Sequence, residues 1–141
     1  MSGFLLDTNV ISELVQRRPN DRVCAWIDST DEQLLYLSVL TLGELRKGIA
    51  LLPDSKRRTQ LEAWFDAQLI PRFSDRILPI DQLVAERWGR ICGSGSARKA
   101  PLPVIDSLLA ATALEHRMTL VTRNLRGLES TGVSVFDPWQ E

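Results

Sequence analysis

Residues 4–12 read FLLDTNVIS, and this stretch decides the fold. The apolar run at its start has the length of a short buried strand, and Asp7 follows it directly. Val10 and Ile11 then begin a series of apolar residues at helical spacing. Asp-Thr-Asn ahead of an apolar helix has the side chains that cap helix N-termini. The stretch predicts a strand that passes through Asp7 into a helix, and taken alone it makes Asp7 a helix cap.

Short apolar runs and helical patterns alternate along the rest of the chain. Further strands are predicted at residues 34–37, 77–80, 120–122 and 133–136, with helices between them. This alternation is typical of a parallel sheet covered by helices on both faces. The chain has 141 residues, the size of one ordinary domain. We therefore expect a single α/β domain over residues 1–141.

Composition excludes several classes of protein. The net charge of −1 leaves no bulk basic surface for nucleic acid, although 14 of the 17 basic residues are Arg. Two cysteines, Cys24 and Cys92, are too few for a disulfide framework and are typical of reduced thiols in a cytoplasmic protein. We expect no signal peptide and no membrane span, since no apolar run approaches about 20 residues. His116 is the only histidine, so we expect the chemistry to depend on carboxylates.

Asp106 lies in a helix that is apolar on every side, LPVIDSLLAATAL at residues 102–114. A helix of this kind is buried. An ionised buried carboxylate costs several kcal/mol, whereas the helix dipole returns only about 0.3–1 kcal/mol at an exposed site. Asp106 is therefore predicted to be paired, to bind a metal, or to face a cleft.

Glu44 is more ambiguous. TLGE at residues 41–44 has capping-box spacing, with Thr41 as the cap. The alternative is that Glu44 joins Asp7 and Asp106 beyond the carboxyl ends of the strands, where parallel sheets bind ligands. Clustered carboxylates repel one another unless a cation lies among them, and such oxygen ligands suit Mg²⁺ or Mn²⁺. This reading predicts a metal-dependent phosphodiesterase.

Four segments together resemble the motifs of PIN-domain ribonucleases, and most closely those of VapC toxins, in order and spacing. They are LLDTNVISEL (5–14), LSVLTLGELRKGI (37–49), PLPVIDSLLAATAL (101–114) and LVTRN (120–124). The resemblance implies a three-layer α/β/α domain with a mostly parallel five-stranded sheet. It implies metal-binding roles for Asp7, Glu44 and Asp106, and supporting hydroxyls on Thr8 and Thr122. It also implies cleavage of RNA, such as tRNA or rRNA, with Mg²⁺ or Mn²⁺, by a homodimer that a small VapB-type antitoxin inhibits.

One departure from the family pattern lies in TRNLRGL, residues 122–128. The family often carries a fourth acidic residue here, whereas this chain has Asn124 and Gly127. We expect Asn124 to orient a metal-bound water through its amide oxygen, and Gly127 to be the first position at which an acid could be restored. The rival reading is a catalytically weak PIN domain that binds RNA or protein without cutting.

Basic and aromatic residues near the motifs suggest two binding surfaces. We expect Arg46, Arg98, Lys99 and Arg123 to form a basic rim for the RNA backbone, although a solvated charged face explains Arg98 and Lys99 equally well. Trp64, beside Phe65 and after the basic run at residues 56–58, is predicted to contribute to the antitoxin groove.

Overall fold

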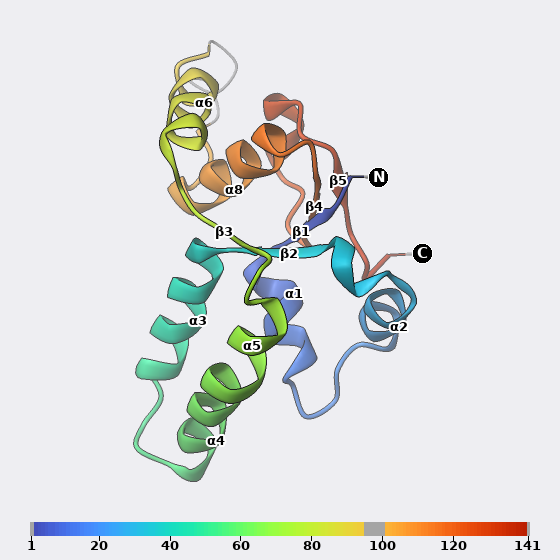
Figure 1. The fold of residues 1–141 in the computed structure, drawn as a ribbon, viewed down its shortest axis with the longest axis vertical. Helices are drawn as coiled ribbons and strands as arrows, with labels where there is room; N and C mark the ends of the chain where they lie inside the picture. Colours follow the sequence, from blue (N-terminus) through green and yellow to red (C-terminus); the bar gives the residue numbers. More distant parts are fainter. Residues whose placement is uncertain (1, 95–100, 141) are drawn as a thin grey trace.

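The fold is built on one parallel sheet of five strands. The computed structural model describes residues 2–94 and 101–140. Its strands are β1 (Phe4–Leu6), β2 (Leu35–Ser38), β3 (Ile77–Leu78), β4 (Thr119–Val121) and β5 (Val135–Phe136). They pair in the order β3-β2-β1-β4-β5, and every pair is parallel (Figure 1). The predicted five-stranded parallel sheet is confirmed, and the strand ends differ from prediction by one or two residues.

Helices cover both faces of this sheet. They are α1 (Thr8–Leu14), α2 (Asp21–Ser29), α3 (Val39–Ala50), α4 (Lys56–Trp64), α5 (Ile70–Phe73), α6 (Gln82–Cys92) and α8 (Val104–Glu115). A π-helical turn, Phe65–Leu69, joins α4 to α5, and two short 3-10 helices span Glu32–Leu34 and Leu128–Thr131. No helix in the described ranges has the length and apolar character needed to cross a bilayer.

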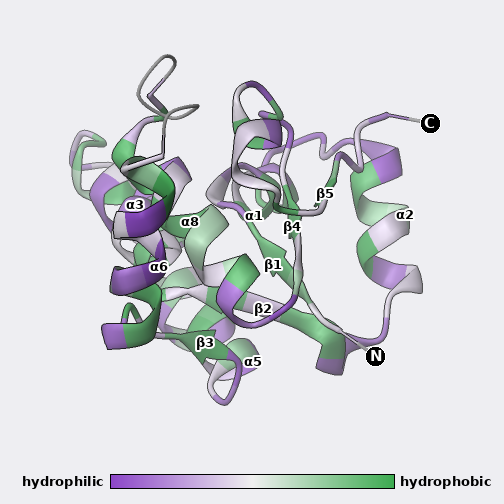
Figure 2. Ribbon diagram, turned by 90° about the horizontal axis from the view of Figure 1, so that it is seen from above, coloured by the Kyte–Doolittle hydropathy of each residue, from purple (hydrophilic) through white to green (hydrophobic). Residues whose placement is uncertain are grey.

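Alternation along β1 divides the core into two layers. Leu6 faces a cluster that includes side chains from α1, α2, α3 and the α4–α5 region. Leu5 faces the opposite cluster, in which α8 supplies Leu109, Ala110 and Ala113. In Figure 2, β1, β4 and α8 are mostly hydrophobic, whereas the outer helices α2, α3 and α6 alternate between hydrophobic and hydrophilic segments. The predicted three-layer α/β/α arrangement is confirmed.

A buried arginine at the edge of the sheet was not predicted. Arg76 precedes β3 and is only 5% exposed. Its guanidinium donates to the carbonyl oxygens of Glu32 and Leu35, each at 2.6 Å, and pairs with the Glu32 carboxylate at 3.0 Å. Because these acceptors surround the start of β2, the buried charge is compensated and ties β3 to its neighbour.

Strand order places the switch point of the sheet between β1 and β4. The chain builds outward from β1 through β2 to β3 on one side, and through β4 to β5 on the other. Ligands of open parallel sheets bind at such a switch point, outside the carboxyl ends of the strands. Asp7 follows β1 and Thr122 follows β4, and the Asp7 N–H donates to the Val121 carbonyl at 2.9 Å. The two polar strand ends are therefore held side by side.

Candidate active site

Asp7 combines a capping role with a place in a cleft. Its Oδ1 accepts a hydrogen bond from the Thr8 N–H at 2.7 Å, so the predicted N-cap of α1 is confirmed. Its Oδ2 accepts a second one from the Thr122 hydroxyl at 2.8 Å. The side chain is 9% exposed and lines a cleft at the carboxyl edge of the sheet. Capping therefore does not exclude a functional role, because each oxygen keeps a further acceptor site.

Thr122 is the centre of the hydrogen bonds behind this cleft. Its hydroxyl is fully buried and donates to Asp7, while it accepts from Asn9 Nδ2 at 3.2 Å and from the Asn124 N–H at 3.1 Å. These contacts join the end of β4 to the start of α1. The structure thus places Thr122 where it orients the Asp7 carboxylate.

Glu44 reaches the same cleft from α3. The capping-box alternative is wrong, because α3 begins at Val39 and Ser38 is its cap, with the Ser38 hydroxyl accepting from the Leu40 N–H at 3.0 Å. Thr41 is therefore already inside the helix, where it is buried. Glu44 Oε1 instead accepts a hydrogen bond from the Thr8 hydroxyl at 2.5 Å. Thr8 positions this carboxylate next to Asp7.

Asp106 completes the set of carboxylates. It lies in the first turn of α8 and is half-buried, whereas the following turns of α8 are buried in the core. Its predicted position at a cleft is what the structure shows. The cleft has a volume of about 410 Å³, and its walls include Asp7, Thr8, Glu44, Asp106, Arg123 and Asn124. Residues from the ends of two strands and from three helices therefore meet in one place.

Burial and mutual repulsion raise the pKa of two of these carboxyl groups. Burial is the main cause for Asp7, and the charges of Asp106 and Glu44 add to it, although the hydrogen bonds from Thr122 and Thr8 act in the opposite direction. For Asp106, burial again comes first and the charge of Glu44 second. A cation bound nearby would lower the pKa of both carboxyl groups, because it favours their ionised forms.

The donor set is all oxygen, which suits a hard divalent cation. Within the described part of the chain, no three His, Cys, Asp or Glu side chains lie close enough together, as they stand, to hold a metal ion. Mg²⁺ is commonly bound by one or two carboxylates and keeps several waters. The residues present therefore fit a cation that is held chiefly by Asp7 and Asp106 and keeps several waters. They fit less well a cation whose ligands all come from the protein.

The predicted basic rim is only partly present at the cleft. Arg123 lines it, with its guanidinium 5.2 Å from the centre of the Trp139 ring. Arg46 does not line it, because it pairs with Asp66 at 2.7 Å and lies over the Phe65 ring. Arg98 and Lys99 fall outside the described residues.

Prediction from sequence missed one wall of the cleft. Asn9, Ser12, Glu13 and Gln16 line it from α1 and the residues just after it, and Trp139 lines it from the C-terminal segment. The spacing of the first four, i, i+3, i+4 and i+7, is one helical face and was the available signal. Trp139 gave no such signal, because a tertiary contact brings it there: its indole N–H donates to Glu13 Oε1 at 3.2 Å.

Gly127 is not a suitable position for a restored acid, so that expectation is wrong. Its φ is +82°, a left-handed conformation that side chains rarely adopt, and an added Cβ would lie 2.8 Å from Leu102 Cδ2. Asn124 is exposed and lines the cleft, which makes it the better position for an acidic substitution.

Trp64 lines a second, mainly apolar groove beside the cleft. This groove of about 240 Å³ runs between α1, α3 and α4, and its apolar walls include Leu45, Leu52, Leu61 and Trp64. Thr8, Ser12, Gln16 and Glu44 line both hollows. A chain lying in the apolar groove would therefore reach the carboxylates.

Comparison with known proteins agrees with this geometry. A family model described as PIN domain matches residues 4–132. Toxin FitB of Neisseria gonorrhoeae is 39% identical over 138 residues, 98% of this chain and 99% of that protein. VapC ribonuclease Y4jK of Sinorhizobium fredii is 35% identical over 137 residues, 97% and 98% of the two chains. The crystal structure of FitAcB from Neisseria gonorrhoeae has a TM-score of 0.92 at 39% identity, covering 98% of this chain and 99% of that one. With a family match over most of its length, the chain belongs to the PIN-domain family.

Proposed function

We propose that this protein is an endoribonuclease toxin of a toxin–antitoxin pair, acting in the cytoplasm on RNA such as tRNA or rRNA. The observation that carries the proposal is the meeting of Asp7, Glu44 and Asp106 in one cleft at the switch point of the sheet. Relatives named as a toxin and as a ribonuclease, aligned over nearly the whole chain, support it.

Within this proposal, Asp7 and Asp106 hold Mg²⁺ or Mn²⁺. When bound, the cation would supply positive charge to the phosphate and to its attacking water. Thr122 and the Thr8 N–H keep the Asp7 carboxylate oriented toward the cleft.

Glu44 is the proposed general base. The Thr8 hydroxyl holds Glu44 Oε1, and Oε2 accepts no hydrogen bond from the described residues. Glu44 takes a proton from water as the water oxygen bonds to phosphorus and one phosphodiester P–O bond breaks. The departing oxygen takes its proton from solvent. Arg123 is exposed at the same cleft, where its charge favours the phosphate.

Removal of divalent metal is the first test. Purified, antitoxin-free protein should cut RNA with Mn²⁺ or Mg²⁺, and EDTA should abolish cutting, as gel analysis of RNA fragments would show. If folded protein leaves a broad panel of RNAs intact with either metal, the catalytically weak binding module becomes the better function.

The apolar groove is the proposed binding site of the VapB-type antitoxin. Trp64→Ala removes the large aromatic side chain from its wall, and we expect the Kd for the antitoxin to rise at least tenfold, because buried aromatics dominate interface energies. Leu83→Ala, at a 60% exposed position outside the groove, is the matched control. Calorimetric titration would measure both, with circular dichroism to show that each variant is folded; an unchanged Kd in Trp64→Ala would contradict the assignment.

A homodimer is proposed through a second apolar surface. Val39, Leu40, Leu51 and Ile105 line a hollow of about 510 Å³ between α3 and α8, and Leu51 is 75% exposed. Exposed apolar patches of this kind mark interaction sites. Leu51→Glu should convert the dimer to a monomer in light scattering, whereas the wild-type mass should be twice that of one chain. A wild type that is already monomeric at high concentration would refute this.

A further inference from the structure

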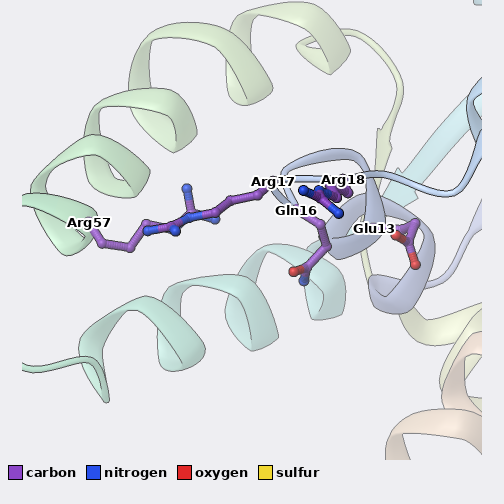
Figure 3. A pocket seen from close by; sticks show the side chains of 5 residues that line it. All are labelled: Glu13, Gln16, Arg17, Arg18 and Arg57. Atoms are coloured by element: carbon purple, nitrogen blue, oxygen red, sulfur yellow. The ribbon is translucent and has the colours of Figure 1, made fainter.

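A polar hollow next to the catalytic cleft has no role in the function described so far. It has a volume of about 660 Å³ and is lined by Glu13, Gln16, Arg17, Arg18 and Arg57. The first four come from the end of α1 and the residues after it, and Arg57 comes from the first turn of α4. Figure 3 shows Arg17 and Arg57 extended toward each other across the gap between these elements. All three arginines are exposed.

The charge in this hollow is not compensated by the protein. Glu13 is its single acidic wall residue, and both Glu13 oxygens are used elsewhere: Oε1 accepts from the Trp139 indole at 3.2 Å, and Oε2 from the Asn20 N–H at 3.1 Å. Within the described residues, Arg17, Arg18 and Arg57 form no ion pair. Arg57 donates one hydrogen bond, to the Val15 carbonyl at 2.8 Å, which holds the side chain against the end of α1 and leaves its charge without a carboxylate partner. Three guanidinium groups that share one hollow repel one another, and an anion relieves that repulsion.

The hollow is continuous with the proposed catalytic cleft. Glu13 and Gln16 line both, so the arginines lie directly beyond the α1 wall of the cleft. By contrast, Arg46, which was predicted to belong to the basic rim, already has an acidic partner in Asp66. With a net charge of −1, the protein has no general basic surface, so a polyanion depends on local groups of arginines that have no acidic partner, and this group is one of them.

We propose that Arg17, Arg18 and Arg57 bind the phosphate backbone of the RNA substrate, on nucleotides adjacent to the one that is cut. This inference rests on the proposed ribonuclease function. The guanidinium fork matches phosphate oxygens in two-point contacts. The neighbouring groove with Trp64 shares Gln16 and Arg57 with this hollow, but its walls are mainly apolar and suit a protein segment. Arg17 and Arg18 line only the polar, positively charged hollow, which favours RNA over the antitoxin as its ligand.

The test compares two double variants of equal charge change in an Asp106→Asn background, so that RNA is bound without being cut. Arg17→Gln/Arg57→Gln removes two arginines of the hollow. Arg90→Gln/Arg117→Gln removes two exposed arginines that line neither hollow. Fluorescence anisotropy with a labelled, mixed-sequence single-stranded RNA pool gives the affinity at several salt concentrations. Far-UV circular dichroism checks folding.

We expect the first variant to lose about 0.7 in salt slope for each phosphate contact removed, hence about 1.4 for the pair, or about 25-fold in affinity at 0.1 M salt. The control should change little, and Arg17→Lys/Arg57→Lys should recover part of the loss, because the charge returns without the fork. Equal losses in both double variants, or no loss in the first, would overturn the proposal. So would a loss of antitoxin affinity with RNA binding intact, which would give the hollow to a protein ligand.

Cleavage by the protein with native Asp106 separates this inference from the proposed function. If that protein cuts RNA but Arg17→Gln/Arg57→Gln binds normally, only the inference fails. If it never cuts RNA but loses RNA affinity in that double variant, the arginine site stands and the nuclease assignment fails.

Discussion

Asp106→Asn should lower the rate of RNA cleavage by about 10²–10³-fold, the range typical of removing one group of an electrostatic site that stabilises the transition state. The substitution keeps the shape of the side chain and removes its charge. Asp106 makes no hydrogen bond within the described residues that the amide would break, so the loss would reflect chemistry and not misfolding. Initial rates of fragment formation with saturating Mn²⁺ measure the effect.

The same substitution should slightly stabilise the metal-free protein. Burial and the charge of Glu44 raise the pKa of Asp106 above its ordinary value of 3.8, so the folded state binds the proton more tightly than the unfolded state does. That stabilising contribution is present below the unfolded pKa and is lost as pH rises through the folded pKa. At neutral pH the ionised side chain is a net penalty that Asn removes. Because the group is half exposed and screened by water, we expect a gain of at most about 0.5 kcal/mol, or roughly 2 °C in Tm.

Thermal unfolding in EDTA between pH 3 and pH 7 checks this expectation, and the gain should all but vanish at pH 3, below the unfolded pKa of 3.8. Asp54→Asn, at an exposed position outside the cleft, is the control and should change neither rate nor Tm. Asp106→Asn with full cleavage activity would remove Asp106 from the site. A lower Tm at pH 7 would show instead that the carboxylate has a structural role.

The sheet was predictable because its signal is local. Short apolar strands and the helices between them follow from hydrophobic spacing, and the place of Asp7 follows from the rule for carboxyl ends of parallel strands. Glu44 shows that local sequence patterns can mislead about where a helix begins. The capping pattern with Thr41 satisfied every rule of spacing, but Ser38 starts the helix three residues earlier.

Tertiary contacts set the features that sequence could not predict. Arg76 can be buried because carbonyl oxygens around β2 accept hydrogen bonds from its guanidinium N–H groups. No pattern in the neighbouring sequence indicates these contacts. Trp139 reaches Glu13 from 126 positions away and thereby leaves the arginines beside Glu13 without an acidic partner. The contacts of such residues depend on which distant segments pack together in the fold. Local sequence patterns do not contain that information.

Asp7→Asn and Asp7→Ala should lower the rate of RNA cleavage equally, by about 10²–10³-fold, but should differ in stability. Asn is as good a helix cap as Asp, so its amide oxygen can keep the bond from the Thr8 N–H. Ala loses that cap, worth about 1 kcal/mol. Both variants leave the buried Thr122 hydroxyl without its acceptor, at a cost of about 1–3 kcal/mol, because the Asn amide nitrogen that replaces Oδ2 donates and does not accept. Loss of a buried charge offsets part of this, so we expect Asp7→Ala to lower the free energy of unfolding by about 1–2 kcal/mol, and Asp7→Asn by less.

Urea unfolding and cleavage rates measured on the same preparations would separate the two roles of this residue. Asp81→Ala is the matched control, because Asp81 caps α6 by accepting from the Val84 N–H at 3.0 Å and lies outside the cleft. It should lose about 1 kcal/mol and keep full activity, since the loss of a cap does not by itself stop catalysis. If Asp7→Asn retained activity within tenfold of wild type, the carboxylate charge would be dispensable and Asp7 would be a helix cap alone. If both Asp7 variants are inactive while Ala is destabilised more than Asn, the strand ends on an aspartate because one oxygen caps the helix and the charge serves the cleft.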